Sequence, residues 1–543
     1  MPATVAADTI LHNAKIWRGH DDGICAALAI WKGRVLATGT NDEILALKGP
    51  GTKVINLAGA FATPGLNDNH LHLMPLGISM GWVDASPDAH PTLASLQAAL
   101  RKRADATPEG DWVMARGYDQ VKLDIGRHPD RSELDAAVPD RPVVLVRACG
   151  HVTLGNSMAL ELAGVDEETA VPAGGVIEKV DGRLTGLLAE NAQCLLRNAP
   201  PAPTVEELIA AAERAGRYLL SQGITSCMDA AVGMAGGFGE IRAYHEAKRT
   251  GRLPVRVWQV LLGDPGRSSI VQQCFDAGLV SGVGDDMLRV GAVKIFLDGS
   301  TGGKTAWTRE PYLCEGATTG VQILPTKQLD ELVREYVGMG YQMACHAIGD
   351  AAIDQLITAY EAVNAAFPDT RHRHRIEHCG YGDDAMHARM KEANILPVPQ
   401  QVFLYDFGDS YAAVLGMDRA RSAYPLATFF EMGFHPSTGS DAPVCKPDPW
   451  PNIYTMLTRK TWKGTVMDEG QRVSIARALQ AYTENSAYSQ NAEEVKGRLI
   501  PGQLADIAVF SRDLLTAEPE DILRNTHCTM TLLGGEIVFE AGG

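Results

Sequence analysis

Six side chains of metal-ligand type stand at the ends of short apolar segments spread along the chain. Each follows a run with the composition of a buried strand, such as YQMACHA before Ile348 and RHRIEH before Cys379. In a (β/α)8 barrel the C-terminal ends of the strands meet on one face, where catalytic groups gather. In chain order, the six side chains are His70, His72, Lys294, His346, His378 and Asp441. Their types and order predict a hydrolytic metal site at the mouth of a barrel.

The four histidines form the core of the predicted metal site. His70 and His72 are two residues apart, so on an extended strand both imidazoles point the same way. Taken alone, His346 or His378 would be interpreted as a hydrogen-bonded core histidine, but their order after the first pair favours ligation. Four imidazoles suit zinc or another borderline divalent ion, whereas magnesium and calcium prefer oxygen. Asp68, two residues before His70, is either an ordinary turn carboxylate or a residue that orients this site.

Lys294 and Asp441 each have two interpretations. A lysine at the end of an apolar strand is costly to bury as a cation. It is therefore either paired with a carboxylate such as Asp298 or converted to a carbamate, a bidentate anion that can bridge two metal ions. Asp441 could be a simple loop or helix-capping carboxylate, but as the last member of the ordered set it is expected to act as ligand and general acid/base.

Composition narrows the class of protein. The 543-residue chain has 45% hydrophobic and 21% charged residues, which is ordinary for a globular protein. Its net charge of −17 disfavours a nucleic-acid or anionic-membrane partner. The ten cysteines contain no CxxC pair, and the N-terminus lacks the features of a signal peptide. We therefore expect a cytoplasmic homodimer that binds a small-molecule substrate, with no nucleic acid and no membrane.

The pattern of elements predicts an α/β fold with three parts. Residues 1–60 and 491–543 alternate like strands of antiparallel sheets, and neither end can bury a core alone. They are expected to form one composite β-sandwich. Residues 61–490 alternate strands and helices, as in a (β/α)8 TIM barrel, with an insertion at about 82–205 over the active-site mouth. The eight predicted strands are 61–67, 223–230, 254–262, 288–296, 341–347, 374–378, 394–399 and 433–440.

Several motifs resemble those of the amidohydrolase superfamily. They are PGLNDNHLH, VKIFLDGSTG, HAIGDAAI, RHRIEH, GSDAPV, AYTENSA and GRLIPGQLADIAVF, and the resemblance covers nearly the whole chain. More narrowly, they are similar to the amidohydrolase 3 group, which includes YtcJ-like proteins and N-substituted formamide deformylases. The resemblance implies a barrel, a composite β-sandwich and one or two metal ions. By position, it assigns metal ligation to His70, His72, Lys294, His346, His378 and Asp441, with Asp441 as the catalytic residue.

The expected reaction is hydrolysis of a C–N bond in an amide, an N-substituted formamide or a related carbonyl compound. A metal-activated water attacks the carbonyl, and Asp441 moves the proton to the departing nitrogen. Zinc is the expected metal, as one or two ions per chain, with a carboxylated Lys294 in the two-metal case. The side chains expected to recognise the substrate are Tyr118, His151, Trp307 and Phe403.

Three alternatives accompany this prediction. A deaminase or a cyclic amide or imide hydrolase of the same superfamily is the nearest, although such deaminases usually have a glutamate after the fifth-strand histidine and this chain has Asp350. A non-catalytic scaffold would be expected to lack some ligands, and all six positions are filled. The segment from Asp298 to Thr305 resembles a phosphate-binding loop, but Asp298 stands where that motif requires glycine.

Overall fold

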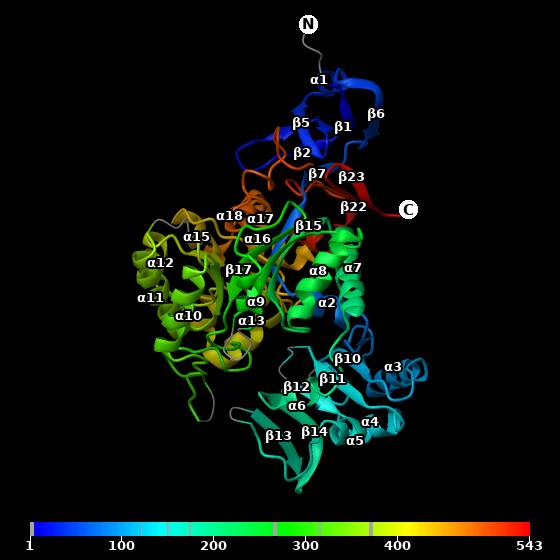
Figure 1. The fold of residues 1–543 in the computed structure, drawn as a ribbon, viewed down its shortest axis with the longest axis vertical. Helices are drawn as coiled ribbons and strands as arrows, with labels where there is room; N and C mark the ends of the chain where they lie inside the picture. Colours follow the sequence, from blue (N-terminus) through cyan, green and yellow to red (C-terminus); the bar gives the residue numbers. More distant parts are fainter. Residues whose placement is uncertain are drawn as a thin grey trace. The chain divides into compact units, whose positions relative to one another are not determined.

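The computed structural model describes residues 5–120, 122–148, 150, 152–172, 175–263, 269–313, 316–368 and 373–542. The chain forms two compact units. The first contains Met1–Leu73 and Ala215–Gly543, and the second contains Met74–Arg214. Figure 1 shows the elements of both.

A parallel sheet of seven strands forms the centre of the first unit in the part of the chain that the structure describes. The order is β20-β19-β18-β17-β16-β15-β8, and all neighbouring strands run parallel. The sheet curls into a nearly closed barrel, which confirms the predicted fold class. The strands are β8 (Leu66–Leu71), β15 (Ile224–Val232), β16 (Arg256–Leu262), β17 (Leu288–Lys294), β18 (Gln342–Ala347), β19 (Arg375–His378) and β20 (Leu396–Val398).

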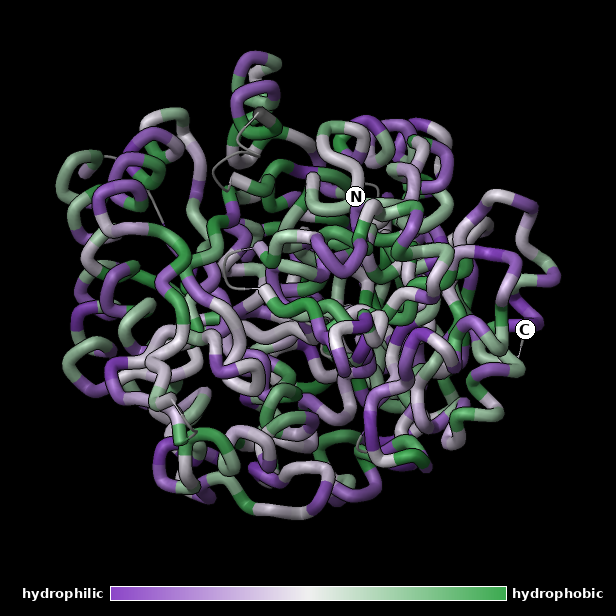
Figure 2. The backbone as a smooth tube through the Cα atoms, turned by 90° about the horizontal axis from the view of Figure 1, so that it is seen from below, coloured by the Kyte–Doolittle hydropathy of each residue, from purple (hydrophilic) through white to green (hydrophobic). Residues whose placement is uncertain are grey.

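Helices follow the strands and cover the outside of the barrel. In α10 (Thr326–Gly338) the apolar residues Leu329, Val333 and Val337 recur at helical spacing and are buried, while most of the intervening residues are polar. Figure 2 shows the same mixture of hydrophobic and hydrophilic residues along the outer helical turns. The other helices near the sheet are α7 (Val205–Ser221), α8 (Phe238–Arg249), α9 (Ser269–Asp276), α11 (Asp350–Ala366), α12 (Asp384–Glu392) and α13 (Val402–Leu415).

Shorter helices complete the C-terminal part of the first unit. They are α14 (Met417–Arg421), α15 (Leu426–Glu431), α16 (Pro449–Thr458), η1 (Glu469–Gln471), α17 (Ile475–Tyr482), α18 (Glu484–Ser489) and α19 (Pro519–Asn525). Among the described residues, no helix combines the length and the apolar composition needed to cross a bilayer.

The predicted eighth strand, 433–440, is wrong. This segment is irregular, yet it lies against β8: Asn69 donates its backbone N–H to Thr438 (3.0 Å), and Asp441 donates to His70 (2.7 Å). The approach is close, because a Cβ at Gly439 would lie 2.5 Å from the backbone nitrogen of His70. Glycine is therefore required there, and the segment fills the gap between β8 and β20 without forming a regular strand.

The predicted first strand, 61–67, also needs correction. Its first half is β7 (Phe61–Pro64), which pairs with β2 (Lys15–Trp17) and β21 (Ile507–Phe510) and so belongs to a different sheet. The barrel strand β8 starts only at Leu66, after Gly65. A continuous buried segment thus contains two strands of different sheets, which the sequence pattern alone does not separate.

The N- and C-terminal strands share one sheet. The order is β23-β22-β21-β7-β2-β3, with β3 at Ile24–Cys25, β22 at Cys528–Leu533 and β23 at Glu536–Glu540. Figure 1 shows the blue N-terminal strands beside the red C-terminal ones. A second sheet has the order β5-β4-β1-β6 and contains β1 (Ala7–His12), β4 (Ala27–Trp31), β5 (Arg34–Gly39) and β6 (Lys48–Asn56). The short helix α1 (Asn41–Leu45) connects β5 to β6 in the chain. A single apolar cluster joins side chains of both sheets, including Leu28, Ile30, Ile507 and Leu532.

A chain that starts at Phe61 should therefore be insoluble or strongly destabilised. It would leave β21 and β7 without β2 and expose the apolar side chains that pack on Leu28 and Ile30. Solubility and thermal melting of the truncated and the full chain test this. A truncated chain that melts like the full chain and keeps full activity would contradict the shared core.

Lys496 is a buried lysine at the start of the barrel strands. Its Nζ contacts Ser226 Oγ in β15 and lies 3.9 Å from the centre of the Trp258 ring. Burial, with a smaller contribution from Arg256, lowers the pKa of Lys496 from 10.5 to about 7. Between pH 7 and 10 the folded chain therefore binds fewer protons than the unfolded chain, so that this group makes stability rise with pH in that window.

The Lys496→Met variant should lose this pH dependence. The melting temperature of the wild type, relative to that of the variant, is expected to rise from pH 7 to pH 9.5. Lys327→Met is the matched control, because the Lys327 side chain is 89% exposed. Parallel melting curves for wild type and Lys496→Met across this range would contradict a lysine that loses its proton near neutrality.

The second unit has its own mixed sheet with a core on each face. The order is β13-β14-β12-β11-β10-β9. In β11 (Val143–Arg147), Val143 and Leu145 pack in one apolar cluster and Val144 and Val146 in another, as strand alternation requires. The unit, Met74–Arg214, is somewhat longer than the insertion of about 82–205 expected from the sequence.

Its other elements are β9 (Val83–Asp84), β10 (Val113–Tyr118), β12 (Val152–Gly155), β13 (Gly175–Val180), β14 (Arg183–Glu190), α3 (Leu93–Asp105), α4 (Arg131–Ala137), α5 (Ser157–Leu162) and α6 (Gln193–Arg197), with α2 (Leu73–Ser79) at its start.

Candidate metal centre

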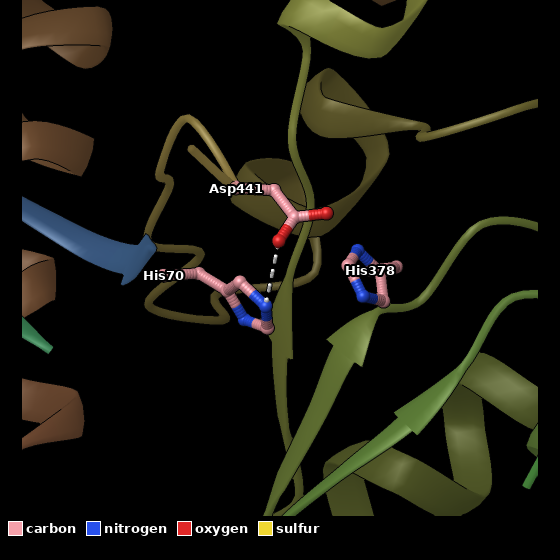
Figure 3. Close-up of side chains that lie close together, drawn as sticks. All are labelled: His70, His378 and Asp441. Atoms are coloured by element: carbon pink, nitrogen blue, oxygen red, sulfur yellow. Dashed lines mark ion pairs between the residues drawn. The ribbon is translucent and has the colours of Figure 1, made fainter. Parts of the chain in front are cut away.

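Three of the predicted side chains converge at the barrel mouth. Ligand atoms of His70, His378 and Asp441 all lie within 4.8 Å of one another, and the three residues are buried (Figure 3). His70 Nε2 is 3.4 Å from Asp441 Oδ1, and among the described residues neither atom has a hydrogen-bond partner. Buried polar atoms rarely remain unsatisfied. Two imidazoles and a carboxylate are a donor set for a divalent ion such as zinc, so the residues fit a metal.

His72 faces the same carboxylate from just beyond the end of β8. Its Nε2 lies 3.1 Å from Asp441 Oδ1, and its ring centre lies 5.7 Å from that of His70. The two histidines of the HxH pair therefore approach one oxygen atom. This arrangement places a fourth donor beside the three that converge.

His346, in β18, packs edge-on against His378 with ring centres 4.5 Å apart. Its Nε2 lies 3.1 Å from the backbone oxygen of Gly299 and 3.1 Å from Asp298 Oδ1. Both neighbours accept hydrogen bonds, so Nε2 carries the proton and Nδ1 keeps the lone pair for a metal.

Asp298 holds the loop after β17 in place. Its carboxylate accepts backbone N–H groups from Trp307 (2.9 Å), Ile348 (3.0 Å) and Gly349 (2.8 Å). In a phosphate-binding loop the amides of segment 298–305 would face the ligand. Here groups of the same segment accept from them: Ser300 N donates to Thr305 Oγ1 (3.0 Å) and Gly303 N to Ser300 Oγ (3.2 Å), which argues against the nucleotide-hydrolase alternative.

Lys294 is the last residue of β17 and is fully buried. Its Nζ lies 4.8 Å from the centre of the Phe296 ring. Burial lowers the pKa of His378 well below the usual range. The charges of His346, His70 and Lys294 lower it further. A neutral imidazole is the form that binds a metal, so this shift suits a ligand role for His378.

Irregular backbone aims three of these side chains. In the pairing of β8 with β15, Asp68 lies opposite Cys227 and Leu71 lies opposite Asp229. Over this stretch β8 therefore has one residue more than β15, and this bulge changes the alternation of its side chains around His70. His378 has φ 70° and Asp441 has φ 55°, in the left-handed region that non-glycine residues seldom adopt. Such backbone strain concentrates at functional sites.

Asp68 fixes the segment that carries Asp441. Its Oδ2 accepts a hydrogen bond from Ser440 Oγ (2.6 Å), and its Oδ1 accepts one from the Ser440 backbone (3.1 Å). Burial raises the pKa of Asp68 to about 7, with the Ser440 hydrogen bonds opposing the rise. The pKa of Asp441 moves the other way: burial would raise it, but His70 and His72 hold it well below its usual range. Asp441 is therefore a carboxylate at neutral pH.

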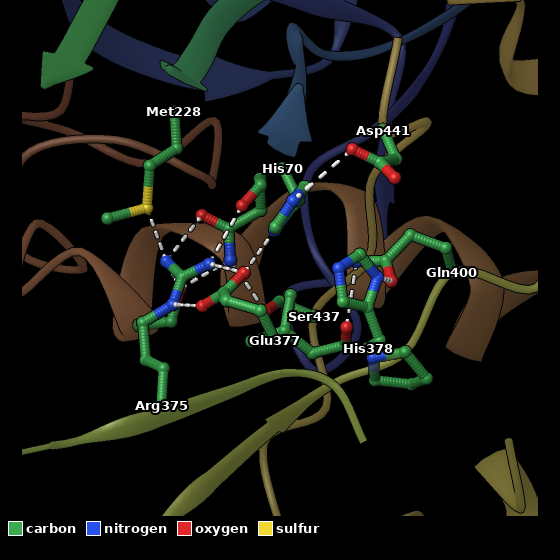
Figure 4. A network of polar contacts seen from close by, with 12 residues as sticks. His70, Met228, Arg375, Glu377, His378, Gln400, Ser437 and Asp441 are labelled. Carbon is green, nitrogen blue, oxygen red and sulfur yellow. Dashed lines mark hydrogen bonds and ion pairs between the residues drawn. The ribbon is translucent and has the colours of Figure 1, made fainter. Parts of the chain in front are cut away.

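Glu377 and Gln400 belong to the site but were not predicted. Glu377 Oε2 contacts His70 Nδ1, and Gln400 Oε1 lies 2.7 Å from His378 Nδ1 (Figure 4). The RHRIEH motif contained a signal for Glu377, since a carboxylate inside a short buried strand needs a partner. Gln400 follows β20 in an ordinary polar context, and nothing in the sequence distinguishes it.

The predicted substrate residues have different surroundings. Phe403, at the start of α13, stacks on His378 with ring centres 5.6 Å apart and planes 15° apart. Trp307 is half-buried, and its backbone nitrogen donates to Asp298. Tyr118 packs fully buried in the apolar core of the second unit, where its hydroxyl lies 2.9 Å from His128 Nδ1. His151 lies outside the described residues.

Comparison with known proteins agrees with the fold and identifies the family. The model of the amidohydrolase family matches residues 53–539. The Bacillus subtilis (strain 168) protein YtcJ, which is named as an amidohydrolase, is 30% identical over 95% of this chain and 96% of its own. The N-substituted formamide deformylase of Arthrobacter pascens is 26% identical over 99% of this chain and 100% of its own.

A solved structure supports the same assignment. An uncharacterized metal-dependent hydrolase from Pyrococcus furiosus superimposes with a TM-score of 0.76 at 28% identity, covering 94% of this chain and 100% of its own. The resemblance inferred from the motifs is thus confirmed. The chain belongs to the amidohydrolase family, and it is a metal-dependent hydrolase that acts on carbon–nitrogen bonds.

Proposed function

We propose that this enzyme hydrolyses an N-substituted formamide or a related amide, releasing an amine and a carboxylic acid. The observation that carries the proposal is the buried convergence of His70, His378 and Asp441, with His72 at the same carboxylate oxygen. The deformylase of Arthrobacter pascens supports the substrate class, since it aligns over essentially both whole chains.

Zinc is the metal that best suits this donor set, because imidazoles dominate it. His70, His72 and Asp441 would hold one ion. His346 and His378 would hold a second, with Lys294 as a bridging carbamate between the two. A bound ion of this kind polarises a carbonyl oxygen and lowers the pKa of water.

Asp441 is proposed as the general base and acid. A carboxylate is the form of this side chain that can take a proton from the attacking water. It then passes that proton to the nitrogen as the C–N bond breaks, and the amine leaves neutral. Phe403, stacked on His378, is proposed to form an apolar wall beside the carbonyl-bearing end of the substrate.

A deaminase of the same superfamily is less well supported. Asp350, the carboxylate nearest in sequence to the position of the deaminase glutamate, lies at the start of α11 and accepts backbone N–H groups from Arg309 (2.9 Å) and Ala351 (3.1 Å). These contacts give it a structural role. The cytoplasmic location and the homodimer expected from the sequence stay predictions.

A panel of N-substituted formamides, longer-chain amides, cyclic imides and aminopurines tests the substrate class. The proposal expects the highest kcat/KM for a formamide or short-chain amide, with amine release measured directly. Ammonia release from an aminopurine, with no turnover of any amide, would replace this proposal by the deaminase alternative.

A further inference from the structure

Glu377 is a buried carboxylate in the site, outside the predicted ligand set. It is 1% exposed and belongs to β19, one residue before His378. Both of its oxygen atoms are engaged. Oε1 accepts from Arg375 Nε (2.6 Å), and Oε2 accepts from Arg375 Nη2 (3.0 Å) and contacts His70 Nδ1.

Arg375 ties this carboxylate to the strand that carries His70. The fully buried guanidinium donates from Nη2 to the backbone oxygen of Asn69 (2.8 Å) and from Nη1 to Asn69 Oδ1 (3.1 Å). Asn69 is also fixed by Gln490 and by Ser489. The guanidinium therefore joins β19 to β8 next to His70, and it holds the Glu377 carboxylate in one orientation.

Among the described residues, the hydrogen-bond partners of the Glu377 side chain are Arg375 and His70. Arg375 has no acceptor, and a carboxylate has no proton to give, so the proton of the contact with His70 resides on Nδ1. His70 Nε2 is then the ring nitrogen without a proton, and it lies 3.4 Å from Asp441 Oδ1, where a shared cation would separate the two acceptor atoms. Hydrogen bonds of this kind to the second ring nitrogen fix the tautomer and orientation of metal-ligating histidines.

We propose that Glu377, clamped by Arg375, is the positioning residue that makes His70 an Nε2 metal ligand. The inference rests on the proposed metal site, and it goes beyond it by assigning the tautomer of His70 to a residue that touches neither metal nor substrate. The negative charge of Glu377 also polarises the imidazole of His70, so that its Nε2 becomes a stronger electron-pair donor to a cation.

Glutamine at position 377 would disturb either the tautomer of His70 or the Arg375 clamp, depending on the orientation of its amide. An NH2 group in place of Oε2 meets the donors of Arg375 and His70, which forces His70 to protonate Nε2 instead. An NH2 group in place of Oε1 meets Arg375 Nε and breaks the clamp. A metal cannot bind a protonated Nε2, so metal affinity should fall while the shape of the site is kept.

Zinc titration of the metal-free full chain against a chromophoric chelator tests the proposal. Glu377→Gln is expected to weaken binding of the tighter ion by about 10- to 100-fold, and Glu377→Asp to recover part of the loss. Glu493→Gln is the matched control. Glu493 forms an ion pair with Arg373, just before β19, and among the described residues it has no hydrogen bond or ion pair with a histidine of the site. It should bind zinc as the wild type does.

The double variant Glu377→Met/Arg375→Met keeps the test decisive if Glu377→Gln fails to fold. Replacing both members of a buried ion pair by apolar residues leaves no uncompensated charge. It also removes the acceptor of His70, so the same loss of zinc affinity is expected. Wild-type affinity in either folded variant would overturn the inference. A wild type that binds no zinc would instead overturn the proposed metal site.

Discussion

Asp441→Asn should lower kcat by about 10²- to 10⁴-fold, the contribution typical of a positioned general base. Asparagine has the same shape and keeps an oxygen toward His70 and His72, but it has no basic carboxylate. The site should therefore keep most of its metal while losing the group that accepts the water proton. Steady-state kinetics on the best substrate of the panel, with elemental analysis of the same samples, measures both effects.

Asp350→Asn is the matched control for this substitution. Asp350 accepts hydrogen bonds from the backbone N–H groups of Arg309 and Ala351. We expect this variant to have a kcat near that of the wild type. An Asp441→Asn enzyme with unchanged kcat, or an Asp350→Asn enzyme with the larger loss, would contradict the assignment of the base.

Lys294→Ala should remove most activity and most of the second metal ion. A free ammonium at about 4 Å from a unit positive charge is repelled by about 4 kcal/mol at an effective dielectric of about 20, and more by a divalent ion. A carbamate on Lys294 removes this repulsion and supplies a bridging anion. Short carboxylic acids such as acetate or propionate should partly restore both activity and metal content in the variant.

Lys327→Ala, which alters an exposed lysine, should change neither quantity. The two-metal arrangement would be contradicted if Lys294 of the active wild type were an unmodified amine beside a single ion. In that case a one-metal hydrolase, with Asp441 still as base, replaces it.

The barrel was predictable because its signals are local. The strands β17, β18 and β19 are short and buried, and they carry Lys294, His346 and His378 at the C-terminal end or one residue before it. Side chains of these types are costly to bury, and the pattern does not depend on distant contacts. The segment before Asp441 also precedes a ligand-type residue, yet it is irregular, because Gly439 must approach the backbone of His70. That constraint comes from β8, far away in the sequence, and periodicity does not reveal it.

The groups that orient the ligands were harder to predict. Glu377 and Gln400 act through tertiary contacts with His70 and His378, and their residue types are compatible with many other roles. The bulge in β8 and the left-handed backbone of His378 likewise depend on pairing and packing. Sequence patterns therefore indicated which side chains do chemistry, but not how the backbone aims them.

Metal content measured together with activity tests the central claim most directly. Purified protein should hold one to two equivalents of divalent metal, lose amide or formamide hydrolysis on exhaustive chelation, and regain it when zinc is added. His70→Ala should fold but hold less metal and lack activity, because His70 is at the centre of the converging ligands. Full activity in protein that elemental analysis shows to be free of metal would contradict the account.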